Sequence, residues 1–210
     1  MAVRESVIHV ADAEIECRIA RISFSGERAF ELYVNSDHGA LVWQYIADYV
    51  ARFDGCLYGM EALGTLRIEK GHVTAAELDG RVTLEDAGFA KMASSKKPYI
   101  GSVLRMRPHL QTLDRPKLVG IFPKDKSHRF GSGAVLCAKG QVAGFGEGWI
   151  TAVTHSPVFG HYIGLGFISG GAEAWRGKPV IIADPVRGQF TEAEIVSPHM
   201  FDPSSERQQG

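Results

Sequence analysis

The chain has 210 residues, of which 45% are hydrophobic and 22% charged, and its formal net charge is −1. These values are ordinary for a globular protein with a substantial core. They give no electrostatic reason to expect nucleic acid or an anionic membrane as a partner. Its apolar runs are shorter than the roughly 20 residues that a membrane span needs. Because the first residues lack the basic-then-apolar pattern of a secretory signal, we expect a cytoplasmic protein.

A β-hairpin is the first predicted element, formed by apolar-alternating runs over residues 15–24 and 30–34. A tight Ser-Gly turn separates the two runs, and Gly26 is expected to take the positive φ that this turn requires. In the second run, Glu31 and Tyr33 point away from the face that carries the apolar side chains. A carboxylate on a strand is rigidly held, so Glu31 can face a pocket. The alternative is a solvated side chain on an edge strand.

Two longer helices are predicted next. Residues 35–37, Asn-Ser-Asp, can cap a helix over 38–53, whose apolar stripe is expected to pack on the sheet. A second helix is expected over 60–70, with Gly71 as its C′ residue. On this helix Arg67 lies at the edge of an apolar stripe, where a guanidinium needs a partner.

The next segment is predicted to contain two short helices. Residues 83–86, Thr-Leu-Glu-Asp, resemble a capping box and should open a helix that ends near Met92. A second short helix is expected over 100–106, after a break at the Lys-Lys-Pro sequence of residues 96–98.

The second half of the chain is rich in turns, because all nine prolines lie at or beyond Pro98. Short strands at regular spacing there predict a closed barrel or a sandwich. The polar tail from Ser204 onward is expected to be disordered. The seven expected strands cover residues 117–122, 134–138, 141–145, 149–154, 161–168, 179–183 and 190–196.

The sequence offers no pattern for a metal, a nucleotide or a catalytic triad. Cys17, Cys56 and Cys137 form no Cys-x-x-Cys motif, so we expect buried free thiols. The histidines show no i, i+4 pair, and the glycine-rich segments do not complete a dinucleotide-binding motif. The residues by themselves therefore indicate an α+β protein with a β-rich second half.

Five motifs, in this order, resemble the glycine cleavage T-protein family. Residues 21–32, Arg-Ile-Ser-Phe-Ser-Gly-Glu-Arg-Ala-Phe-Glu-Leu, are similar to the family signature R-x-S/G-Y/F-T/S-G-E-x-x-F-E-I/L. Residues 58–72 are similar to a second signature. Their Leu-Arg-Ile-Glu-Lys-Gly-His ending resembles the form found in α subunits of heterotetrameric sarcosine oxidases. The other three motifs lie at 82–88, 97–101 and 148–160.

The resemblance implies an α+β fold class, in which an antiparallel sheet with packed helices is followed by a small antiparallel β-barrel. It implies a partial aminomethyltransferase-like folate-binding domain over 1–108, a barrel domain over 109–200 and a disordered tail over 201–210. In that family three lobes enclose tetrahydrofolate. This chain corresponds to about the C-terminal half of the architecture.

Site residues follow from the same resemblance. The motif match implies that the pterin-binding carboxylate of the family corresponds to Glu31. A carboxylate suits this task, because an anion can accept both N–H donors on the edge of a pterin. Phe24 takes the place of an aromatic hydroxyl and keeps only the ring surface. Leu63 takes the place of a frequent arginine. Arg67, one turn further on, is expected either to partner Glu31 or the cofactor, or to form a structural salt bridge. The catalytic Asp of the family lies upstream, so the resemblance implies no catalytic residue in this chain.

The implied cofactor is tetrahydrofolate, and FAD, FMN and NAD are expected only in other parts of a sarcosine oxidase. The implied role is to bind the folate that captures the one-carbon unit of oxidised sarcosine as 5,10-methylene-tetrahydrofolate, and the chain alone is expected to be inactive. Alternatives are a stand-alone folate-dependent aminomethyltransferase or demethylase, and a non-catalytic assembly module. Expected partners are the upstream region and other subunits of such an oxidase, and a homodimer formed through exposed apolar surface.

Overall fold

The computed structural model describes residues 2–94, 96–141 and 146–209. It divides into two compact units, one made of residues 1–66 with 204–210 and the other of residues 67–203. This division differs from the domains expected from the sequence, 1–108 and 109–200. Residues between 67 and 115 belong to the second unit because their polar side chains are bonded within it. One example is Asp86, which accepts hydrogen bonds from Arg115.

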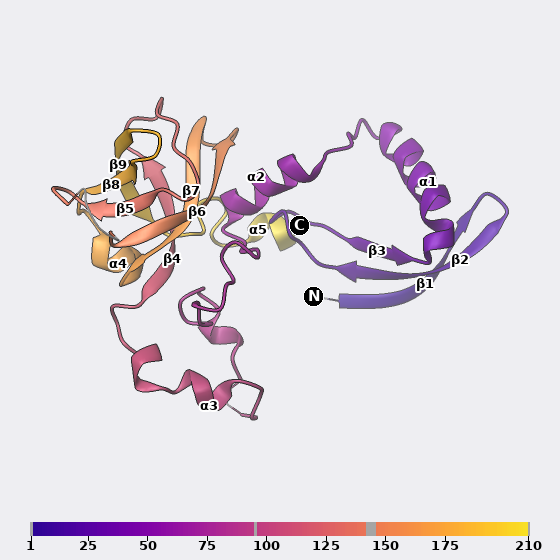
Figure 1. Cartoon of the computed structure of the whole chain (residues 1–210). Helices are drawn as coiled ribbons and strands as arrows, with labels where there is room; N and C mark the ends of the chain where they lie inside the picture. Colours follow the sequence, from indigo (N-terminus) through magenta and orange to yellow (C-terminus); the bar gives the residue numbers. More distant parts are fainter. Residues whose placement is uncertain (1, 95, 142–145, 210) are drawn as a thin grey trace. The chain divides into compact units, whose positions relative to one another are not determined.

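The first unit contains a three-stranded antiparallel sheet in the order β1–β2–β3 (Figure 1). The strands are β1 (Ala2–Val10), β2 (Ala13–Arg21) and β3 (Glu31–Val34). Strands β2 and β3 confirm the predicted hairpin. Strand β1 was not predicted, because polar and charged residues interrupt its apolar alternation at residues 4–6.

The connection between β2 and β3 is a loop over residues 22–30 rather than the expected tight turn. Gly26 has the predicted positive φ, 86°. Its amide donates a hydrogen bond to Ser23 Oγ at 3.0 Å, and the amide of Glu27 donates to Ser25 Oγ at 3.3 Å. The turn chemistry of Ser and Gly is therefore present, but it bends the middle of a longer loop.

Helix α1 (Gly39–Ala51) follows a 3₁₀ helix (Ser36–His38) and confirms the helix predicted over 38–53. Asn35 caps the start, since its side-chain oxygen accepts from the amide of Asp37 at 3.2 Å. Only Val42 of this helix is buried, against the apolar side chains of β1 and β2. The expectation that the whole stripe packs on the sheet is therefore wrong. The stripe side chains that are exposed are Leu41, Tyr45, Ile46 and Tyr49.

Helix α2 (Met60–Lys70) has the predicted bounds, and Gly71 follows it with φ 80°, as expected for a C′ residue. The predicted capping box also forms: the Thr83 amide donates to Asp86 Oδ2 at 2.9 Å, and the Asp86 amide donates to Thr83 Oγ1 at 3.2 Å. The helix expected after it does not form. The chain makes turns through Gly88 (φ 83°) and then a 3₁₀ helix (Ala90–Met92).

The short helix expected over 100–106 is present as α3 (Ser102–Arg105), and a 3₁₀ helix (Pro108–Leu110) follows it. None of the helices within the described ranges is long and apolar enough to cross a membrane. Of the three cysteines, Cys17 and Cys137 are buried as expected, whereas Cys56 is exposed.

The second unit contains a closed antiparallel barrel with the strand order β4–β7–β6–β5–β8–β9 (Figure 1). The structure thus decides between the barrel and the sandwich that the sequence left open. Of the predicted strands, the one at 141–145 falls almost wholly outside the described residues. The strands are β4 (Pro116–Pro123), β5 (Val135–Ala138), β6 (Gly148–Ser156), β7 (His161–Ser169), β8 (Val180–Asp184) and β9 (Gln189–Val196). Helix α4 (Gly171–Trp175) lies between β7 and β8 in the chain and was not predicted.

Inward-pointing aliphatic side chains fill the barrel. They come from all six of its strands and have almost no exposed surface, so they form one continuous core. Its members include Val119, Ile121, Leu136, Ile150, Ile168 and Ile182.

The end of the chain differs from the disorder predicted for residues 201–210. Residues 206–209 form a short helix, α5 (Glu206–Gln209), which belongs to the first unit. Arg207 Nε donates to Glu27 Oε1 at 2.6 Å, and Arg21 Nη2 donates to the carbonyl of Gln209 at 2.8 Å. Disorder was expected because the tail is polar and has few apolar residues to bury. In the structure, ionic and backbone hydrogen bonds hold it instead.

Candidate functional site

Strand β3 places Glu31 and Tyr33 on the face of the sheet opposite to α1. Leu32 and Val34 alternate with them and pack with the small core that contains Val42. We call the face of the sheet opposite to α1 the outer face. Residues that pair directly across neighbouring strands share a face, and Ala20 pairs with Glu31, Arg18 with Tyr33, and Glu5 with Arg18. The outer face therefore carries a polar group made of Glu5, Arg18, Tyr33 and Glu31, which we call the outer-face cluster.

Hydrogen bonds orient the outer-face cluster. The Tyr33 hydroxyl donates to Glu31 Oε2, and Arg18 Nε donates to Glu5 Oε1 at 2.8 Å. The hydrogen bond to Glu31 raises the pKa of Tyr33 above its ordinary value, because deprotonation would remove the donor and place two anions together. Both Glu31 and Tyr33 are exposed, and β3 is an edge strand of the sheet. Of the two alternatives that the sequence left open for Glu31, the structure therefore shows the solvated carboxylate on an edge strand. Its geometry gives a held acceptor on an uncovered sheet face.

Phe24 lies in the β2–β3 loop of the same unit, with 36% of its surface exposed. A partly exposed ring offers a flat apolar surface, which is the property that the sequence assigns to it. Phe24 and Glu31 therefore come from one continuous segment, residues 22–31, that contains most of the first signature.

Arg67 is buried, with 8% exposure, and belongs to the second unit. Its Nη1 donates to Glu77 Oε2 at 2.9 Å and to the carbonyl of His72 at 3.2 Å. Of the interpretations left open by the sequence, the structure shows the structural salt bridge. Glu77 was missed, although Thr74-Ala-Ala-Glu77 has the spacing of a capping box and the Thr74 amide does donate to Glu77 Oε2 at 2.8 Å.

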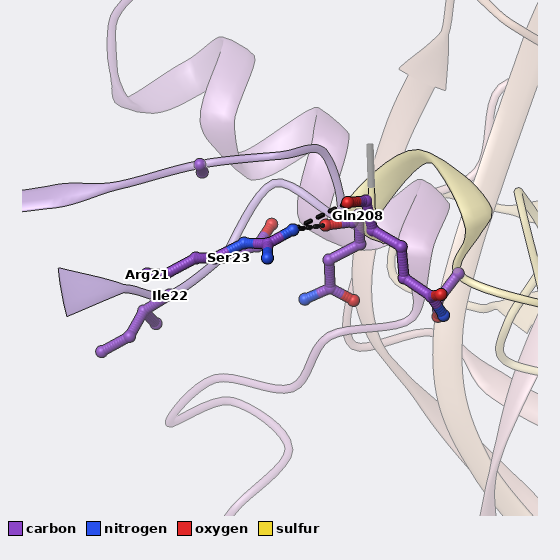
Figure 2. Close-up of a pocket in the computed structure, with 7 residues that line it drawn as sticks. Arg21, Ile22, Ser23 and Gln208 are labelled. Atoms are coloured by element: carbon purple, nitrogen blue, oxygen red, sulfur yellow. Dashed lines mark hydrogen bonds between the residues drawn. The ribbon is translucent and has the colours of Figure 1, made fainter. Parts of the chain in front are cut away.

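A polar pocket of about 550 Å³ lies at the start of the β2–β3 loop (Figure 2). It is lined by Arg21, Ile22, Ser23, Ala29, Ser205, Gln208 and Gln209. By strand alternation Arg21 lies on the same face as Ile19, which pairs with Leu32, so it projects from the face opposite to Glu31. The signature segment therefore presents an exposed carboxylate on one face and a polar pocket on the other.

The chemistry available in the first unit is that of hydrogen bonding and charge. Glu31 can accept from two N–H groups, and Phe24 can pack against a planar ring. Within the residues that the structure describes, no group of three His, Cys, Asp or Glu side chains is arranged to hold a metal ion. The role of Glu31 and Phe24 in ligand binding stays a prediction.

Two family models match the chain in succession. The GCVT N-terminal domain matches residues 3–97, and the glycine cleavage T-protein C-terminal barrel domain matches residues 117–202. Sarcosine oxidase subunit alpha from Rhizobium meliloti (strain 1021) is 38% identical over 190 residues, which are 89% of this chain and 19% of that protein. The corresponding subunit from Corynebacterium sp. (strain U-96) is 37% identical, over 95% of this chain and 21% of that protein.

Aminomethyltransferases are similar over a larger share of their own length. The aminomethyltransferase of Corynebacterium jeikeium (strain K411) is 28% identical, over 85% of this chain and 46% of that protein. The crystal structure of the glycine cleavage system aminomethyltransferase T from Bartonella henselae has a TM-score of 0.72 at 19% identity, and the match covers 89% of this chain and 50% of that one. This likeness confirms the fold. The chain spans about a fifth of the sarcosine oxidase subunits and about half of the aminomethyltransferases.

Proposed function

Because this chain belongs to the glycine cleavage T-protein family, we propose that it is the tetrahydrofolate-binding region of a sarcosine oxidase α subunit. The observation that carries the proposal is the position of Glu31. This residue occupies the carboxylate position of the first signature, starts β3, and is held by the Tyr33 hydroxyl on an open sheet face. The relatives named sarcosine oxidase subunit alpha support this branch of the family.

The outer-face cluster fits the polar edge of a reduced pterin. The ring N–H and the exocyclic amine of a pterin form two adjacent donors, and the carboxylate of Glu31 can accept both. Such charge-assisted hydrogen bonds contribute about 1.5–3 kcal/mol once the site is shielded from water. Phe24 supplies apolar surface for the ring.

The task of these residues is to bind and orient. A bound reduced folate supplies the nucleophilic nitrogen that takes up a one-carbon unit. Glu31, Tyr33 and Phe24 would fix the plane and direction of the pterin, which favours reaction by proximity. No counterpart of the family's catalytic Asp is assigned in this chain, so we expect the 210-residue chain to bind folate without turning over a methylated amine.

The decisive experiment is a titration of the chain with 5-formyl-tetrahydrofolate by calorimetry. Glu31→Gln keeps the shape of the side chain but removes its charge, and we expect it to weaken binding about 30-fold, equivalent to about 2 kcal/mol. Glu16→Gln is the matched control, because Glu16 is an exposed carboxylate that faces the same side from β2 and lies opposite Val7. Circular dichroism of both variants checks that the fold is unchanged.

Other outcomes decide between the alternatives. Equal loss of affinity in the Glu31 and Glu16 variants contradicts the assignment of Glu31. Absence of folate binding, both by the chain alone and with the upstream region of the parent protein joined to it, favours the assembly module. Turnover of sarcosine or another methylated amine by the chain alone favours the stand-alone enzyme.

The proposal extends to partners. In a sarcosine oxidase α subunit this region would contact the rest of that subunit and other subunits, and FAD, FMN and NAD would bind outside it. The exposed aromatic and aliphatic side chains of α1 provide apolar surface for such contacts. The same surface supports the expected homodimer of the isolated chain.

A further inference from the structure

The C-terminal tail, residues 204–209, is tied to the loop that leads to Glu31. It lies beyond residue 202, where the match to the barrel family model ends. We propose that this tail is a positioning segment, which fixes the β2–β3 loop and thereby the start of β3. The effect on ligand binding rests on the proposed function of Glu31, whereas the effect on the loop does not.

The first attachment is between Arg21 and the end of α5. Arg21 Nη2 donates to the carbonyl oxygens of Gln208 at 3.3 Å and of Gln209 at 2.8 Å. Figure 2 shows the Arg21 side chain reaching the tail, with these two hydrogen bonds drawn. The last carbonyls of a helix lack donors within the helix, and a cation placed there satisfies them. Arg21 is the last residue of β2, so this contact holds the beginning of the loop.

The second attachment is in the middle of the loop. Arg207 Nε donates to Glu27 Oε1 at 2.6 Å, and Glu27 follows the Gly26 turn directly. Side-chain exposure is 56% for Arg207 and 37% for Glu27, so the pair alone contributes little to global stability. Its consequence is local, because one short helix now holds two points of the same loop.

The tail also completes the polar pocket. Ser205, Gln208 and Gln209 line it together with Arg21, Ile22, Ser23 and Ala29 from the strand end and loop. Figure 2 shows Gln208 beside Arg21 and Ser23 in this pocket. The loop ends at Phe30, one residue before Glu31. A loop fixed at both Arg21 and Glu27 has fewer conformations, so the position of Glu31 is better defined.

The test is amide hydrogen exchange of residues 22–30 in the 210-residue chain and in three variants. Removal of residues 204–210 is expected to speed exchange about tenfold, because two contacts that oppose local opening are lost. Arg207→Glu should speed it less. The combined swap Glu27→Arg with Arg207→Glu restores opposite charges and should return exchange toward the original rate.

The control is Arg176→Glu, which disrupts an exposed pair with Glu173 in the second unit and should leave the loop unchanged. Unchanged exchange of residues 22–30 after removal of the tail overturns the proposal, as does a swap that fails to restore the rate. The titration with 5-formyl-tetrahydrofolate separates the two proposals. If removal of the tail speeds loop exchange but Glu31→Gln does not weaken folate binding, the positioning role of the tail is supported and the folate site is rejected. If loop exchange is unchanged but Glu31→Gln weakens folate binding, the folate site is supported and the positioning role is rejected.

Discussion

The two units of this chain differ in whether they bury ion pairs. In the second unit, the side chains of three ion pairs are at most 17% exposed: Arg67 with Glu77, Lys70 with Asp202, and Arg115 with Asp86. In the first unit, the pairs Glu5–Arg18 and Glu27–Arg207 have side chains that are 37–71% exposed. Among the described residues, the second unit therefore buries some of its ion pairs and exposes others, such as Arg176 with Glu173, whereas the ion pairs of the first unit lie at its surface.

The apolar core of the second unit, the barrel unit, is also larger than that of the first, the sheet unit. The barrel has a continuous core of aliphatic side chains, whereas the core of the sheet unit centres on Val10, Ile15 and Val42. The sheet unit also leaves most of the α1 stripe and the outer-face cluster exposed. The comparison indicates that the barrel unit supplies stability, and that the sheet unit offers the surfaces available for a ligand or for further protein.

The largest effect is expected from breaking a buried pair in the barrel unit. Glu77→Gln leaves the guanidinium of Arg67 buried without its counter-charge, and we expect the free energy of unfolding to fall by about 3–5 kcal/mol. Urea unfolding measures this loss. Glu173→Gln, which affects an exposed pair of the same unit, is the control and should change the stability by less than about 1 kcal/mol. Equal effects of the two variants would falsify the contrast between buried and exposed pairs.

An intermediate effect is expected at Asp86. Burial by itself would raise the pKa of Asp86, but hydrogen bonds from Arg115 and Thr83 outweigh it and hold the pKa below its ordinary value. Asp86→Asn should lower stability at neutral pH by about 1.5–3 kcal/mol.

The pH dependence has a definite sign. Because the folded-state pKa of Asp86 is depressed, its contribution is present above the unfolded-state value of about 3.9 and is lost as pH falls through the folded-state value. Thermal unfolding of wild type and Asp86→Asn between neutral and acid pH should therefore show a Tm difference that narrows below about pH 4. A constant Tm difference across this range contradicts the role of the ionised carboxylate.

The smallest effect is expected from an exposed pair of the sheet unit. Glu5→Gln removes the partner of Arg18, and we expect a loss of at most about 1 kcal/mol that disappears at high salt. Hydrogen exchange of the β2 amides, measured at low and high salt, reports on this unit directly. A loss of stability as large as that caused by Glu77→Gln, or a loss that persists at high salt, would contradict the claim that exposed ion pairs of the sheet unit contribute less than buried pairs of the barrel unit.

The sequence by itself determined the elements whose signals are local. Apolar alternation predicted the β2–β3 hairpin, and helical periodicity with a following glycine gave the bounds of α2 and the conformation of Gly71. The spacing of strands and turns predicted a closed barrel or a sandwich, and the order of motifs led to the family. Glu31 emerged as a candidate from a signature, and its role stays a prediction.

Tertiary structure alone decided which polar groups meet and which apolar surfaces are covered. Arg115 reaches Asp86 across 29 positions of sequence, and Arg207 reaches Glu27 across 180. Such contacts leave no periodic trace in the chain, because they depend on where separate elements pack. The exposed stripe of α1 shows the same limit. Periodicity marks an apolar face on a helix, but burial of that face depends on whether another element lies against it.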